Sequence, residues 1–91
     1  MNPHKIYVQV DARFDRDGFV HPRSIIWVNG REYEIDRVLD ITHMHATKAG
    51  GTGDRFTIRV NGQQRYLFYE RFNDLEGNHV GRWFVECPES P

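Results

Sequence analysis

With 91 residues, a formal net charge of −1 and one cysteine, the chain is the size of one domain and has neither an intrachain disulfide nor a globally basic composition. It lacks an apolar run near the roughly 20 residues of a membrane helix and a signal-peptide pattern at its start. We therefore expect a single cytoplasmic β domain over residues 1–91, ordered over about 5–87, with no membrane partner.

Apolar and polar residues alternate with a period of two along most of the chain, which is typical of half-buried strands. Turn sequences such as Asn-Gly and Asp-Gly separate the alternating runs. Strands are predicted over Ile6–Phe14, Phe19–Val28, Arg31–Thr42, Phe56–Arg59, Gln63–Phe72 and Arg82–Cys87. The pattern predicts an all-β fold, a six-stranded antiparallel meander that forms a small SH3-like or strongly bent barrel.

The turn at Val28-Asn29-Gly30 leaves two registers open for the first hairpin. A two-residue type I′ turn pairs Ile25 with Glu34, whereas a three-residue turn pairs Ile25 with Tyr33. We predict the three-residue turn, because it keeps the apolar residues of the hairpin on one face, whereas a one-residue slip would move every side chain of one strand to the other face. These residues are Ile25, Trp27, Tyr33 and Ile35.

The same choice arises for the second hairpin, at Val60-Asn61-Gly62. A two-residue turn pairs Phe56 with Leu67, and a three-residue turn pairs Phe56 with Tyr66. We again predict the three-residue turn, because it places four apolar residues on one face. These are Phe56, Ile58, Tyr66 and Phe68.

In this register the outer face of the second hairpin becomes a basic stripe with apolar groups in it. The outer face of the first hairpin is acidic, and residues 43–72 are the most basic part of the chain. Such a stripe has three interpretations: an ordinary solvated strand face, a protein interface, or a single-strand nucleic-acid surface. The candidate binding residues are Arg55, Arg59, Arg65, Tyr69 and Arg71, together with Phe84, an apolar residue on the charged face of the last strand.

His43 and His45 would point the same way if this segment is extended, which could hold a metal ion. Zinc needs at least a third protein ligand, and no spacing selects one. We therefore expect no metal, with His43 and His45 as the first candidate ligands to test. The further ligands that the sequence offers are His21, Asp40, His79 and Cys87.

The glycines Gly50, Gly51 and Gly53 precede a strand rather than a helix, so they differ from a phosphate-binding loop. We interpret this glycine-rich segment as a joint between two hairpins.

Catalytic residues are scarce, because Ser24 and Ser90 are the only serines and Cys87 lies on the apolar face of its strand. We expect no enzymatic activity and no cofactor.

The segment Ser24–Asp40, which reads IxWxxGRxYxIxRVLD from Ile25, is followed by Gly50-Gly51-Thr52-Gly53, Arg55-Phe56 and Arg82–Glu86 (RWFVE). This pattern resembles short bacterial proteins of unknown function. The resemblance covers about residues 23–87 and implies a free-standing small β domain. It contains no catalytic motif and implies no activity.

Together these features predict a non-enzymatic small β-barrel module that binds a protein partner or associates with itself as a homodimer. The alternative is single-stranded nucleic-acid binding through the basic-aromatic strand face. A further alternative is a metal-binding protein that uses His43 and His45.

Overall fold

The computed structural model describes residues 4–45 and 52–87, and only the backbone of His45 and Cys87. Every regular element in these ranges is a strand, rich in the β-branched and aromatic residues that favour pleated sheets. None of them is a helix that could cross a membrane. The strands are β1 (His4–Phe14), β2 (Val20–Ile26), β3 (Glu32–Glu34), β4 (Arg37–His45), β5 (Thr52–Val60), β6 (Gln63–Asn73) and β7 (His79–Cys87).

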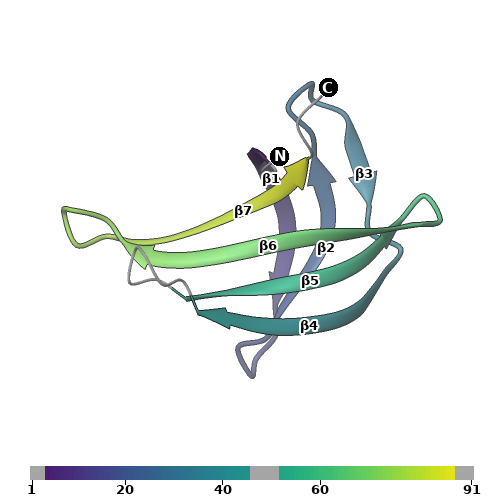
Figure 1. Cartoon of the computed structure of the whole chain (residues 1–91). Coiled ribbons are helices and arrows are strands. Elements are labelled where there is room, and N and C mark those ends of the chain that lie inside the picture. Colours follow the sequence, from purple (N-terminus) through teal and green to yellow (C-terminus); the bar gives the residue numbers. More distant parts are fainter. Residues whose placement is uncertain (1–3, 46–51, 88–91) are drawn as a thin grey trace.

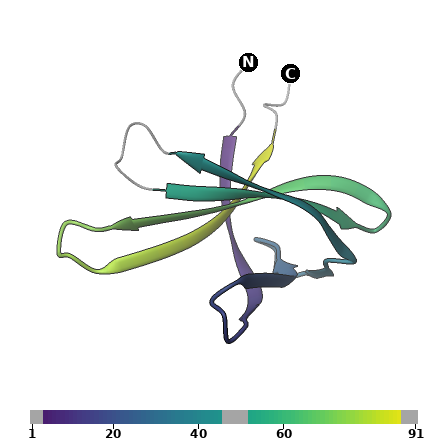
Figure 2. The ribbon, with the colours of Figure 1, turned by 90° about the horizontal axis from the view of Figure 1, so that it is seen from below.

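The strands form one antiparallel sheet in the order β3-β2-β1-β7-β6-β5-β4. Strands that follow one another in the chain are neighbours, except β3 and β4, which form the two edges of the sheet. The pairing of β1 with β7 joins β1–β3 to β4–β7. The sheet curls strongly into a half-barrel (Figures 1 and 2). The prediction of an antiparallel all-β fold with a strongly bent sheet is confirmed.

The predicted strand over Arg31–Thr42 is two strands, β3 and β4, so the sheet has seven strands rather than six. Between β3 and β4 the chain passes from one edge of the sheet to the other. Ile35 N–H donates to the carbonyl of Arg23 in β2 (2.9 Å), and Asp36 N–H donates to the carbonyl of Arg59 in β5 (2.8 Å). Because β2 and β5 each lie next to one of the two edge strands, at opposite sides of the sheet order, residues 35–36 link the two edges of the half-barrel.

The register predicted for the first hairpin is confirmed. Ile25 pairs with Tyr33, and Trp27 N–H donates to the carbonyl of Arg31 (2.8 Å). Gly30 has a positive φ of 87°, and Asn29 Oδ1 accepts the N–H of Arg31 (2.9 Å). The turn therefore contains three residues and ends on a glycine in the left-handed region.

The register predicted for the second hairpin is wrong. Val60 pairs with Gln63, and Phe56 pairs with Leu67 rather than Tyr66. Asn61 and Gly62 both have positive φ, 51° and 75°, which is the two-residue type I′ turn. Each side chain of β6 therefore faces the side opposite to the predicted one.

The core lies on the inner face of the half-barrel. Phe56, Ile58 and Leu67 are at most 1% exposed, and the ring of Trp83 lies 5.4 Å from that of Phe56, centroid to centroid. Ile25 adds β2 to this cluster, so the core joins β2, β5, β6 and β7.

The predicted joint between the hairpins is shorter than expected, because β4 extends to His45 and β5 begins at Thr52. Gly50 and Gly51 lie outside the described residues. Gly53 is part of β5, where a Cβ atom would be 2.7 Å from the carbonyl oxygen of Tyr69. Gly53 therefore permits a close approach of β5 to β6.

Candidate functional site

The structure divides the six predicted binding residues between the two faces of the sheet. Residues directly opposite each other across a ladder share a face. Arg65 pairs with Ile58 and Tyr69 with Trp83, so both lie on the inner face with the core. Arg71, two residues beyond Tyr69, follows the same alternation. Arg55, Arg59 and Phe84 lie on the outer face, so the prediction of one continuous stripe is wrong.

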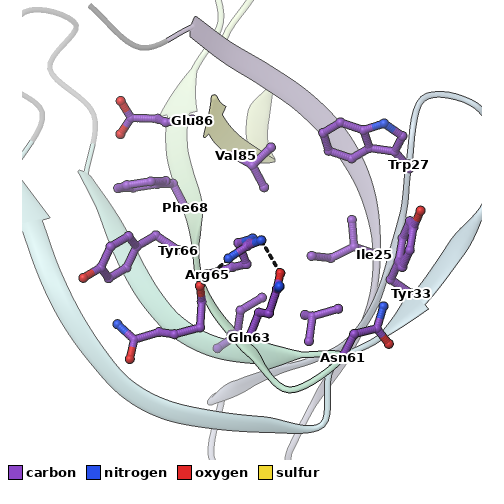
Figure 3. A pocket seen from close by; sticks show the side chains of 13 residues that line it. Ile25, Trp27, Tyr33, Asn61, Gln63, Arg65, Tyr66, Phe68, Val85 and Glu86 are labelled. Carbon is purple, nitrogen blue, oxygen red and sulfur yellow. Dashed lines mark hydrogen bonds between the residues drawn. The ribbon is translucent and has the colours of Figure 1, made fainter. Parts of the chain in front are cut away.

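The inner face contains the largest cavity described, a cleft of about 790 Å³. Ile25, Trp27 and Tyr33 line it from the first hairpin, Ile58 from β5 and Val85 from β7. Figure 3 shows Ile25, Trp27, Tyr33 and Val85 around a common space, with the β6 residue Arg65 reaching into it. We call this cavity the inner cleft.

The cleft opens where β6 and β7 separate. In the described residues the ladder between them runs from Phe68–Phe84 to Asn73–His79 and contains no pair nearer the start of β6. Residues 63–67 of β6 continue along β5, whereas residues 85–87 of β7 continue along β1. The start of β6 therefore has a strand on one side and the cleft on the other.

The edge of β6 presents backbone hydrogen-bonding groups to this opening. Across a two-residue turn the flanking residues, here Val60 and Gln63, bond to each other, and bonded pairs then alternate along the ladder. In this register the peptide groups of Gln64 and Tyr66 point away from β5 and toward the cleft. The two residues form the β6 edge discussed below.

The side chain of Arg65 lies across this edge. Its Nη1 donates to the carbonyl oxygen of Gln64 (2.9 Å), and its Nη2 donates to Oε1 of Gln63. Both bonds stay within three consecutive residues of β6, so they can be exchanged without disturbing the sheet. Arg65 therefore occupies one edge acceptor, and its side chain reaches into the cleft (Figure 3).

Phe84, the apolar residue on a charged face, is buried by neighbours on the outer face. Its ring stacks on Phe68 at 4.9 Å between centroids, with 5° between the planes. It also meets the edge of the Tyr7 ring at 5.7 Å, and Lys5 Nζ lies 4.7 Å from its centroid.

The Tyr7 hydroxyl donates to Glu70 (2.8 Å), and burial together with this bond raises the pKa of Tyr7.

His43 has a carboxylate partner. His43 Nδ1 and Asp54 Oδ1 are 2.6 Å apart, and Arg71 Nη2 lies 3.7 Å from the other oxygen of Asp54. Within the described residues no three possible metal ligands gather in one place. The side chain of His45, the second candidate ligand, lies outside the described residues.

Sequence reasoning placed Ile25, Trp27 and Tyr33 together but did not identify the cleft in front of them. The cleft depends on the separation of β6 from β7, which no local pattern encodes. The available signal was the Asn61-Gly62 dipeptide, because its usual two-residue turn directs Arg65 toward Ile25 and Trp27.

The chain was also compared with known proteins. No protein-family model, curated protein or solved structure gives a match.

Proposed function

We propose that this chain is a non-enzymatic binding domain that accepts an extended segment of a protein partner in the inner cleft. The observation that carries the proposal is the β6 edge beside an apolar cavity. Extended peptides bind such edges by adding a strand, and pockets beside the edge select their side chains. The β6 edge supplies the backbone groups and the inner cleft supplies the pocket.

The size and lining of the cleft support recognition of an apolar side chain. A volume of about 790 Å³ lies within the usual range of ligand pockets, which are lined mainly by apolar and aromatic groups. Trp27 and Tyr33 offer large contact areas of the kind that dominates protein interfaces. The polar groups of the lining include amides, the Arg65 guanidinium, the Glu86 carboxylate and the hydroxyl groups of Tyr33 and Tyr66, which suit orientation of a ligand.

A second copy of the chain is the alternative occupant. Self-association through the β6 edge would appear as a mass that rises with protein concentration in sedimentation, and Gln64→Pro would abolish it. The proposal for a partner protein predicts a monomer that binds peptides. We also propose a cytoplasmic location, because a chain with one cysteine does not depend on an oxidising compartment.

The proposal is tested with random peptides displayed on phage and selected on the immobilised full chain. Enriched peptides are then titrated against the free protein and two variants. Gln64→Pro removes an N–H of the β6 edge that makes no bond to β5, which an edge strand tolerates. Gln64→Ala changes the same side chain and keeps the N–H, so it is the matched control.

We expect Gln64→Pro to weaken peptide binding about tenfold, the value of one hydrogen bond near 1.4 kcal/mol. Gln64→Ala should stay within about twofold of the parent. Trp27→Ala should also weaken binding, because it removes one wall of the cleft. Failure to enrich any peptide, or equal binding by Gln64→Pro and Gln64→Ala, would contradict the proposal.

A further inference from the structure

The outer face of the sheet carries a row of side chains across four strands. Arg55 of β5 pairs with Phe68 of β6, Phe68 with Phe84 of β7, and Phe84 with Tyr7 of β1. Because directly paired residues share a face, the guanidinium and the three rings lie side by side. Strand spacing makes this row about 15 Å long.

Cations cover the rings of this face. The Arg55 guanidinium lies 4.8 Å from the centroid of Tyr66. The Arg82 guanidinium lies 4.3 Å from Tyr7 and 4.8 Å from Phe72. Arginine on an aromatic ring presents a flat π surface outward, on which another planar group can stack.

The charges of this face are compensated at one end only. Glu70 lies 3.2 Å from Arg82 and 3.8 Å from Lys5, so these two cations have an acidic neighbour over β1 and β7. Over β4 and β5 the arrangement differs. Arg37 stands directly opposite Arg59 in the ladder, a pairing of like charges that is unfavourable without an anion.

Arg55 shares that face with Arg59, four residues along β5, at a distance of about 13 Å in an extended strand. Throughout residues 4–44 and 52–86, no carboxylate forms an ion pair with Arg37, Arg55 or Arg59. Arg55 Nε is buried without a hydrogen-bond partner. Asp40 lies on the same face and accepts a hydrogen bond from Thr42 (3.3 Å).

We propose that this outer face binds single-stranded nucleic acid, with Arg37, Arg55 and Arg59 on the phosphates and the adjoining rings on the bases. The Arg37–Arg59 pair and Arg55 are two separated cationic points, and their three guanidinium groups can contact successive phosphates of one strand. Tyr66, which pairs with Thr57 between Arg55 and Arg59, and the adjoining arginine planes can stack bases, which single-strand binding proteins do without reading sequence. An acidic peptide would satisfy the charges and leave the π surfaces without a partner.

Arg37, Arg55 and Arg59 do not line the inner cleft, whereas Tyr66 and Phe68 also do, so Arg59→Gln distinguishes a failure of this proposal from a failure of the peptide proposal. The test measures fluorescence anisotropy of labelled twelve-residue oligo-dT and oligo-rU with the full chain. Three arginine–phosphate contacts predict a slope of log affinity against log salt near −2. Affinity should therefore fall about 100-fold between 20 and 200 mM salt.

Four variants locate the site. Arg59→Gln should weaken binding at low salt and reduce the slope by about 0.7. Arg31→Gln removes the same charge beside the turn of the first hairpin. It should leave both the affinity at low salt and the slope unchanged. Tyr66→Ala should weaken binding about 5- to 100-fold through loss of stacking, and Tyr66→Phe should retain it. Circular dichroism checks the fold of each variant, and Arg59→Gln carries the test if Tyr66→Ala is unfolded.

Three results would overturn the inference. The first is no anisotropy change at 20 mM salt with 100 μM protein. The second is equal loss of binding in Arg59→Gln and Arg31→Gln, which would indicate diffuse attraction. The third is competition by poly-glutamate as strong as that by unlabelled oligonucleotide, which would indicate an acidic-peptide surface. Binding that Trp27→Ala leaves intact would separate this site from the inner cleft.

Discussion

Val60 and Gln63 pair directly across the two-residue turn Asn61-Gly62, and this pairing decides which side chains of β6 face the cleft. Gly62 has a φ of 75°, a conformation that costs an L-residue about 1–2 kcal/mol. Gly62→Ala should therefore lower the free energy of unfolding by about that amount in urea titrations. Gln64→Ala, on an exposed position of the same hairpin, should change it by less than about 0.5 kcal/mol.

The register also predicts an asymmetry between two neighbouring residues. Leu67 is fully buried on the inner face, whereas Tyr66 is 46% exposed on the outer face. Leu67→Ala should destabilise the protein by about 2–5 kcal/mol, as truncation of a core leucine does. Tyr66→Ala should cost clearly less, and the reverse order in urea unfolding would contradict the register.

The ring of Tyr69 lies over Gly81 of the neighbouring strand. A Cβ atom on Gly81 would be 2.8 Å from Cζ of Tyr69, and Tyr69 also packs on Trp83 at 4.5 Å between centroids. Gly81→Ala should therefore cost about 1–3 kcal/mol, the usual range for overpacking. In a Tyr69→Ala background, Gly81→Ala should lower the free energy of unfolding much less. If the two substitutions have additive effects on this free energy, the contact between Tyr69 and Gly81 is contradicted.

The loop between β6 and β7 predicts a dependence of stability on pH. Asp74 accepts hydrogen bonds from the side chain of Asn78 (3.0 Å) and from the backbone N–H groups of Asn78 and Glu76 (2.8 and 2.9 Å). These bonds lower the pKa of Asp74 below 3.8, and the bond from the Asn78 side chain makes the largest contribution. Because the pKa of Asp74 is lower in the folded state, the ionised carboxylate stabilises the fold at pH values above its unfolded-state pKa. This stabilisation is lost as the pH falls through its folded-state pKa.

Asp74→Asn should therefore lower the urea midpoint at pH 7 and have less effect at pH 2.5. Asp17→Asn, on an exposed residue of the β1–β2 turn, serves as the control. A difference between Asp74→Asn and the parent that is the same at both pH values would show that the carboxylate charge does not contribute.

The strands were predictable because their period-two pattern is local. Runs such as Ile6–Phe14 and Gln63–Phe72 correspond to β1 and β6, with small shifts at their ends. The seventh strand was not predictable, because Ile35 and Asp36 continue the alternation of their neighbours. Only their hydrogen bonds to two different strands, β2 and β5, divide the segment.

The candidate site was less predictable, because it depends on which of two turns forms at each Asn-Gly. Asn29 uses its side chain to accept the N–H of Arg31, whereas Asn61 adopts a positive φ. The dipeptide is identical in both turns, and the surrounding packing decides between them. In the second hairpin the partner of Phe56 is Leu67, which is fully buried, whereas Tyr66 is 46% exposed.

The most direct test of peptide binding in the inner cleft is to measure amide hydrogen exchange by NMR, with and without a peptide enriched in the phage selection. A peptide strand added to the β6 edge should slow exchange at Gln64 and Tyr66 at least about tenfold, because their N–H groups gain partners. The N–H of Arg65 points toward β5 and should change little. Protection of Gln64 and Tyr66 in the complex is the predicted result, and a tightly bound peptide that leaves both rates unchanged would contradict the proposed function.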